Sequence, residues 1–259
     1  ERTPRAGQKF PHSPFVISEK KALGPLSVNE HTLSAINVKY DPEVIQQFLK
    51  SDAEIFPLPL SAEKSAEVVV QRVISRDRGT YSFLGKVADD PFSDVLLVFH
   101  DGAVSGSVVY YKTNTHYEFG MSGDGDIAIR RLDPKTYGVP CACAQEHHCP
   151  PPAAVEEFLA ACDHAAPLPE RAAVQDEAEI LADGADVTYM DTVVGYGNAA
   201  RVAEGGTSAM EAKIIASVDR SNLAFTNSLI QNIELVLAAT IEDPDYAYPG
   251  TISGNMSSD

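Results

Sequence analysis

The length, composition and charge of the chain bound the classes of protein to which it can belong. Its 259 residues suffice for one large domain or two ordinary domains, and an apolar content of 44% indicates a globular rather than a disordered chain. With 37 acidic and 20 basic residues the formal net charge is −17, which disfavours binding to nucleic acid or to anionic membranes.

The chain carries no apolar stretch near the roughly 20 residues that a membrane-spanning helix needs. Its numbering starts at Glu1 rather than at methionine, which fits a mature chain after removal of a signal peptide and fits a shortened chain equally well.

Residues 1–30 are polar and rich in proline. Pro4, Pro11, Pro14 and Pro25 argue against regular structure, so this segment is predicted to be an extended N-terminal arm. Such an arm is either a tail or a segment that packs on a neighbouring copy.

Residues 31–135 are predicted to form a β-rich antiparallel domain. A helix is expected at 42–50, where Val44, Ile45 and Phe48 recur on one side. Turn residues separate short apolar runs at intervals of about ten residues, a spacing typical of an antiparallel sandwich or barrel. The expected strands include the runs at 68–74, 81–85, 94–99, 104–111, 116–119 and 127–129.

Residues 136–185 change character and are predicted to be a linker between domains. They contain a Cys/His/Pro cluster and then an Ala- and Glu-rich stretch with one short helix at 153–162. Three pairings are possible among the four cysteines, and a bridge from Cys162 to one of the other three is favoured over a strained Cys141–Cys143 bridge.

Residues 186–259 are predicted to begin an α/β domain. Strands are expected at 187–196 and 233–241, with a helix at 208–226 between them. Ser208 and Glu211 have the spacing of a capping box at the start of that helix. The whole chain is therefore expected to be α+β, a β-rich antiparallel domain followed by an incomplete, βαβ-like segment whose sheet edges are uncovered.

Several motifs follow one another along the two halves of the chain. The first half contains the G-T-Y-S-F-L-G run at 79–85, the D-G-A-V-S-G run at 101–106 and the run at 124–134. The second half contains the D-T-V-V-G-Y run at 191–196 and the segment at 198–228. In this order the motifs resemble those of secreted bacterial reprolysin-like zinc metallopeptidases of the metzincin class. The resemblance covers residues 35–135 and 186–255, and it implies a propeptide-like domain at 31–135 followed by the N-terminal part of a catalytic domain at 186–259.

The chain departs from this family at the point where catalysis would begin. Metzincins hold zinc through H-E-x-x-H-x-x-G-x-x-H, in which two histidines share one helix face and the glutamate acts as general base. None of the seven histidines here is followed by glutamate, so the chain is predicted to be inactive alone and to contain no catalytic residue. The zinc is expected in the parent enzyme, whose motif would lie after Asp259.

The densest local group of metal-binding residue types lies in the linker. Thiolates and imidazoles suit zinc, and a propeptide thiolate could occupy the zinc position that water needs. Disulfide or free cysteines, an inhibitory zinc ligand and an independent metal site all remain open for this cluster. Its members are Cys141, Cys143, His147, His148 and Cys149.

Two functions from different classes follow from these observations. The first is the propeptide and partial catalytic domain of a secreted zinc metallopeptidase, with an inhibitory or folding-assisting role and the remainder of the catalytic domain as its partner. The second is a secreted structural protein that assembles with copies of itself through the open edges of its α/β segment. Both place the protein outside the cell.

Overall fold

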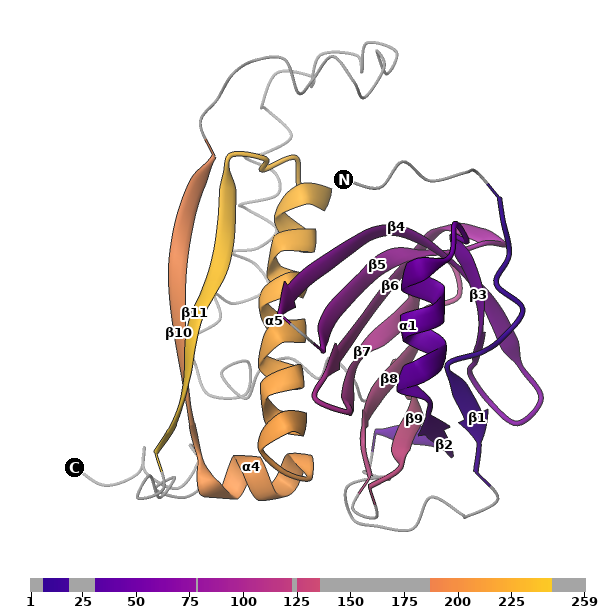
Figure 1. The fold of residues 1–259 in the computed structure, drawn as a ribbon, viewed down its shortest axis with the longest axis horizontal. Helices are drawn as coiled ribbons and strands as arrows, with labels where there is room; N and C mark the ends of the chain where they lie inside the picture. The colour runs from indigo at the N-terminus through magenta and orange to yellow at the C-terminus, as the bar shows by residue number, and fades with distance from the viewer. Residues whose placement is uncertain (1–6, 19–30, 78, 123–124, 136–186, 244–259) are drawn as a thin grey trace, which may run out of the picture.

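The computed structural model describes residues 7–18, 31–77, 79–122, 125–135 and 187–243, and these fall into two units (Figure 1). The first, called here the antiparallel unit, comprises the described residues up to 135. The second, called here the βαβ unit, comprises residues 187–243. Strands dominate the first unit and a long helix the second, in agreement with the predicted α+β class.

The antiparallel unit is built on one nine-stranded sheet. Its strand order is β1-β2-β9-β8-β7-β6-β5-β4-β3, and every neighbouring pair is antiparallel. The sheet curls strongly and nearly closes on itself, so the expected barrel describes it better than a sandwich (Figure 1). The strands are β1 (Phe15–Ile17), β2 (Thr32–Tyr40), β3 (Ile55–Pro59), β4 (Ser65–Asp77), β5 (Thr80–Val87), β6 (Asp90–His100), β7 (Ala103–Tyr110), β8 (Thr115–Met121) and β9 (Ile127–Leu132).

Helix α1 (Pro42–Lys50) lies within the concave side of this sheet and has the predicted bounds (Figure 1). Asp41 caps it by accepting a hydrogen bond from the backbone N–H of Glu43 at 2.9 Å. Ile45 and Phe48 are buried in the main hydrophobic core. The amphipathic spacing read from the sequence therefore predicts both the helix and its buried face.

Strand β6 contributes side chains to apolar clusters on both faces of the sheet. Val95, Leu97 and Phe99 belong to the main core on the concave side. Leu96 and Val98 point the other way and pack against helix α5. Because side chains alternate along a strand, an uninterrupted apolar run such as this one is suited to a strand covered on both faces.

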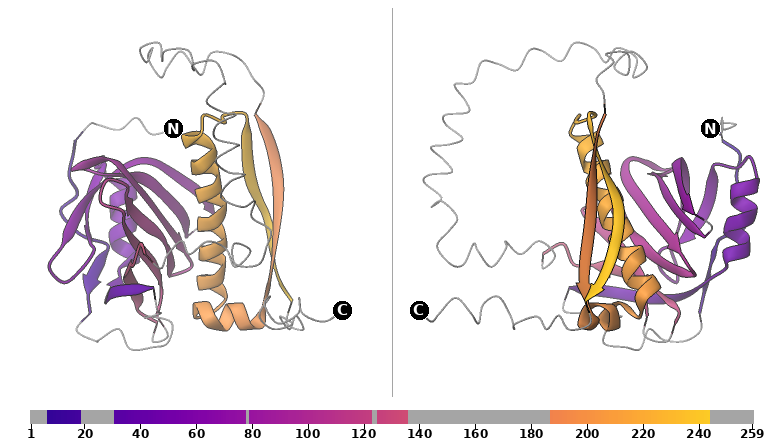
Figure 2. Two further views of the ribbon diagram at one scale, coloured as in Figure 1. Left: turned by 180° about the vertical axis from the view of Figure 1, so that it is seen from behind. Right: turned by 60° about the vertical axis from the view of Figure 1, so that its left-hand side comes forward.

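The βαβ unit consists of β10 (Thr188–Gly197), α4 (Asn198–Glu204), α5 (Thr207–Asn227) and β11 (Ile233–Asp243). The two strands pair in parallel, as the strand–helix–strand pattern predicts. Figure 2 shows α5 standing between this two-stranded sheet and the convex side of the antiparallel unit. Helix α5 is thus the layer that the two units share.

Three features differ from the expectations. Phe15–Ile17 in the N-terminal arm forms β1 and pairs with β2. These three apolar residues lie between prolines in the sequence, and their backbone adds a strand to the edge of the sheet. Residues 198–204 form α4, a helix that the sequence patterns do not predict, and it ends at the left-handed Gly205. The capping box is absent, because Gly206 is the N-cap of α5 and Ser208 and Glu211 lie inside the helix.

Candidate functional site

A chain of polar side chains crosses the boundary between the two units near the start of α5. Thr80 Oγ1 lies 2.8 Å from His100 Nδ1, and His100 Nε2 lies 3.0 Å from Glu211 Oε2. The other carboxylate oxygen of Glu211 accepts a hydrogen bond from Thr240 Oγ1 at 3.0 Å. Three layers are connected in this way: the antiparallel sheet through Thr80 and His100, α5 through Glu211, and β11 through Thr240.

A hydroxyl, an imidazole and a carboxylate in sequence are the groups that nucleophilic catalysis uses. Here the hydroxyl belongs to Thr80, of which only 2% is exposed. A nucleophile has to reach the substrate, so a threonine covered to this extent does not serve as one. We therefore assign the Thr80–His100–Glu211 chain to the contact between the layers.

An ion pair forms a second polar connection, farther along α5. Arg76 of β4 donates to Asp219 Oδ1 and, through its other terminal nitrogen, to Ser82 Oγ at 2.8 Å. The Asp219 side chain is 1% exposed and that of Arg76 28%. Asp219 Oδ2 is buried and has no hydrogen-bond partner among the described residues. A buried carboxylate of this kind is costly unless its cation stays in place.

Two further contacts lie toward the end of α5. Arg220 donates to Ser107 Oγ of β7 at 2.5 Å. Asp94 of β6 accepts hydrogen bonds from Lys86 Nζ at 2.6 Å and, more distantly, from Asn227 Nδ2 at 3.4 Å. Together with the two connections above, they flank a small apolar strip in which Leu96 and Val98 pack against Ile215 and Ala216.

Within the βαβ unit, one side chain fixes β11 to α5 through the backbone. Asn222 Nδ2 donates to the carbonyl of Leu235 at 2.9 Å, and the N–H of Leu235 donates to Asn222 Oδ1 at 2.8 Å. The amide side chain therefore satisfies both backbone groups of a strand residue, as a neighbouring strand would. This contact holds α5 to its own unit independently of the antiparallel sheet.

His116 of β8 is expected to make the stability of the fold depend on pH. Burial lowers the pKa of His116 below 6.5, and the Arg220 guanidinium lowers it further, while Glu118 opposes both. Below about pH 6.5 the unfolded chain therefore takes up a proton that the folded chain does not. We expect the free energy of unfolding to fall as the pH drops through this window and to level off below the folded-state pKa.

Urea denaturation at a series of pH values between 7 and 4 measures this dependence. His116→Gln removes the titrating ring, so the variant should lose part of the fall in unfolding free energy. An identical pH dependence in the variant and the parent protein would contradict the assignment to His116.

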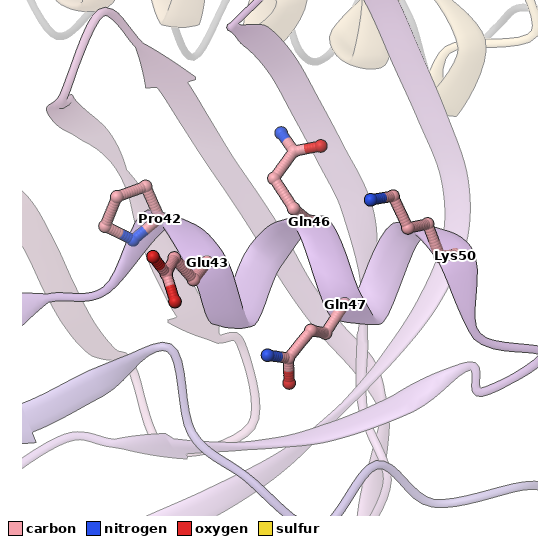
Figure 3. A pocket seen from close by; sticks show the side chains of 5 residues that line it. All are labelled: Pro42, Glu43, Gln46, Gln47 and Lys50. Atoms are coloured by element: carbon pink, nitrogen blue, oxygen red, sulfur yellow. The ribbon is translucent and has the colours of Figure 1, made fainter.

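Two surface hollows in the described structure offer little to a ligand. One, of about 310 Å³, is lined by five side chains of α1 alone, and Figure 3 shows them projecting from the helix rather than converging on a point. The other, of about 270 Å³, lies where the β6–β7 turn meets the start of α5. Its lining consists mostly of small residues and includes the Asp101 carboxylate, with no basic side chain to attract an anion.

The Cys/His cluster predicted as a metal or disulfide site lies outside the described residues. Its members Cys141, Cys143, His147, His148 and Cys149 therefore remain predictions. In the part of the chain that the structure describes, no group of three or more His, Cys, Asp or Glu side chains is arranged to hold a metal ion. None of the described helices is both long and apolar enough to cross a membrane.

Sequence reasoning missed the residues that join the two units. The local pattern places Glu211 in a capping box and indicates no partner for His100. In the structure their side chains meet each other, although they are 111 positions apart. No local pattern encodes such a contact, because the two residues lie in segments far apart in the sequence.

Comparisons with known proteins were made for the whole chain. No protein-family model matches it, and neither the curated proteins nor the solved structures gave a match. Any function for the chain must therefore be argued from its own residues and their arrangement.

Proposed function

We propose that the chain is the propeptide and the first part of the catalytic domain of a secreted zinc metallopeptidase. In this proposal the antiparallel unit assists folding of the peptidase and keeps it inactive. The βαβ unit begins the catalytic domain, and the zinc-binding residues belong to the remainder of that domain. This chain itself performs no catalytic step.

The observation that carries the proposal is the way in which the two units meet. The antiparallel unit has its own core around Phe83, Phe99 and Phe119. It covers one side of α5, whose other side packs on β11. The contact is a small apolar strip flanked by polar pairs, which is typical of an interface between units rather than of a single core. A propeptide that covers a helix of its enzyme needs this kind of contact.

The βαβ unit has the character of a part rather than of a complete domain. Tyr189 and Val193 of β10 and Ile241 of β11 point away from α5 and are more than half exposed. Parallel strands are normally covered on both faces. Further strands and helices of a catalytic domain would cover this outer face and extend the sheet.

The proposed activity is tested on the native gene product rather than on the 259 residues alone. We expect the purified protein to contain one zinc ion per chain, measured by inductively coupled plasma mass spectrometry. We expect it to cleave a protein substrate only after the antiparallel unit has been removed. A native product without zinc that stays inactive after this treatment would exclude the proposal.

The alternative is a secreted structural protein that assembles with its own copies, and the exposed outer face of β10 and β11 is the observation that favours it. Under this alternative the chain should associate reversibly as its concentration rises, as measured by analytical ultracentrifugation. Val193→Lys would place a charge on the outer face and abolish association. Val202→Lys, at an equally exposed position on α4, is the matched control and should behave as the parent chain does.

A chain that stays monomeric at all concentrations would exclude the self-assembling alternative. Association that Val193→Lys and Val202→Lys weaken equally would show that the outer face of β10 and β11 is not responsible.

A further inference from the structure

We infer that the contact between the antiparallel unit and α5 is a latch that opens without unfolding the antiparallel unit, and that the Arg76–Asp219 ion pair is its principal fastening. This inference concerns the 259-residue chain alone. It therefore holds or fails independently of the proposed peptidase.

Main-chain connections across the contact are absent from the part of the chain that the structure describes. In the described ranges no backbone–backbone hydrogen bond joins the antiparallel unit to residues 187–243, and no strand of one unit pairs with a strand of the other. Backbone ladders are what make a sheet or a helix cooperative, so two layers without them can separate as intact bodies.

The apolar contacts are distributed unevenly between the main core and the contact with α5. The main core of the antiparallel unit lies on its concave side and includes nothing from the βαβ unit. The apolar contact with α5 is formed instead by Leu96 and Val98 with Ile215 and Ala216, and by a small alanine cluster near the start of the helix. Opening the latch therefore exposes a limited apolar area and leaves the larger core intact.

Polar pairs join α5 to the antiparallel sheet at two positions along the helix. The sheet presents Arg76 and the imidazole of His100, and the helix presents Asp219 and Glu211 to them. The two acids are eight residues apart, which is about 12 Å along a helix. The helix is thus held at two separated points, which fixes its position along the sheet as well as its distance from it.

The described residues satisfy the carboxylate of Asp219 only in part. Its Oδ2 has no partner among the described residues while the latch is closed. Water would hydrate that oxygen as soon as the helix moved away. The closed state therefore carries a penalty that the open state lacks, and the pairing with Arg76 has to offset it. Loss of the Arg76 side chain should therefore shift the equilibrium between the closed and open states toward the open state. The shift should exceed the one expected from the loss of a surface ion pair.

Hydrogen–deuterium exchange of the full chain, read by mass spectrometry, tests the inference. Arg76→Ala should raise the exchange rate of the α5 amides by about ten-fold or more, because opening removes the cover on that helix. Amides of β2, β8 and β9 should keep the rates of the parent chain. Arg72→Ala alters an exposed arginine of the same strand that makes no hydrogen bond or ion pair to α5 among the described residues, and it should change the rates of neither set of amides.

Two outcomes of this experiment would overturn the inference. An equal rise in the amide exchange rates of α5 and of β2, β8 and β9 would mean that the two units unfold together rather than separate. Unchanged exchange rates in α5 would mean that Arg76 does not fasten the contact.

A charge exchange separates pairing from the mere loss of a side chain. Arg76→Asp and Asp219→Arg should each raise exchange in α5, because each places like charges opposite one another. Combining them should return the α5 rates at least halfway to those of the parent chain on a logarithmic scale. If the double variant exchanges as fast as the worse single variant, the ion pair is not the fastening.

Discussion

Phe99→Ala is expected to lower the free energy of unfolding by about 3–5 kcal/mol, the largest loss from a single truncation in the antiparallel unit. Phe99 is 1% exposed, and its ring lies 5.2 Å from that of Phe83 and 5.3 Å from that of Tyr40, centre to centre. Removing the ring leaves a cavity that the curled sheet cannot fill without moving its strands. Urea denaturation followed by circular dichroism measures the loss.

Phe92 provides the matched control for this truncation. It lies on the same strand, but it is 62% exposed and contacts chiefly the ammonium group of Lys112. Phe92→Ala should cost less than about 1 kcal/mol. If Phe99→Ala and Phe92→Ala lowered the free energy of unfolding equally, the main core would not lie on the concave side of the sheet.

Gly106→Ala is the second substitution with a large expected effect, about 3 kcal/mol or more. Gly106 of β7 pairs with Leu97 of β6. A Cβ atom at position 106 would lie 2.1 Å from the carbonyl oxygen of Leu96 and 2.9 Å from the Cα of Leu97. These are backbone atoms, so the two strands would have to separate where α5 packs on them.

Gly195→Ala is the control for Gly106→Ala. Its added Cβ would come no closer than 4.0 Å to the carbonyl oxygen of Ile241. The variant should therefore fold with nearly the stability of the parent chain, as thermal denaturation would show. Similar losses for Gly106→Ala and Gly195→Ala would contradict the close approach of β6 and β7.

Sequence patterns predict the elements of this fold well where the pattern is local. The apolar spacing at Val44, Ile45 and Phe48 gives α1 with its observed bounds. The parallel pairing of β10 and β11 follows from the strand–helix–strand order. In both cases neighbouring residues carry the information, because the period of the apolar positions identifies the element and its buried face.

The sequence predicts less where one segment is completed by another far away. Phe15–Ile17 lies among prolines and becomes a strand only because β2 offers an edge to it. Glu211 fits a local capping pattern, yet its carboxylate joins His100 and Thr240. Arg76 and Asp219 are 143 positions apart, and neither residue shows in its own segment that it will pair with the other.

Those long-range contacts are also the ones on which the functional account depends. The core around Phe83, Phe99 and Phe119 stabilises the antiparallel unit, but it does not distinguish a propeptide from any other β-rich domain. The distinction rests on how α5 is covered. Arg76, His100 and Asp94 contact that helix through polar side chains. The separable cover that we infer from these contacts is what the proposed propeptide role requires.

We propose that this chain forms the N-terminal part of a zinc peptidase and supplies none of its catalytic groups. Peptide mapping of the protein purified from its natural source tests this most directly. The account predicts a peptide containing H-E-x-x-H in the same polypeptide, after the position of Asp259. A complete map of the natural polypeptide without that motif would contradict it.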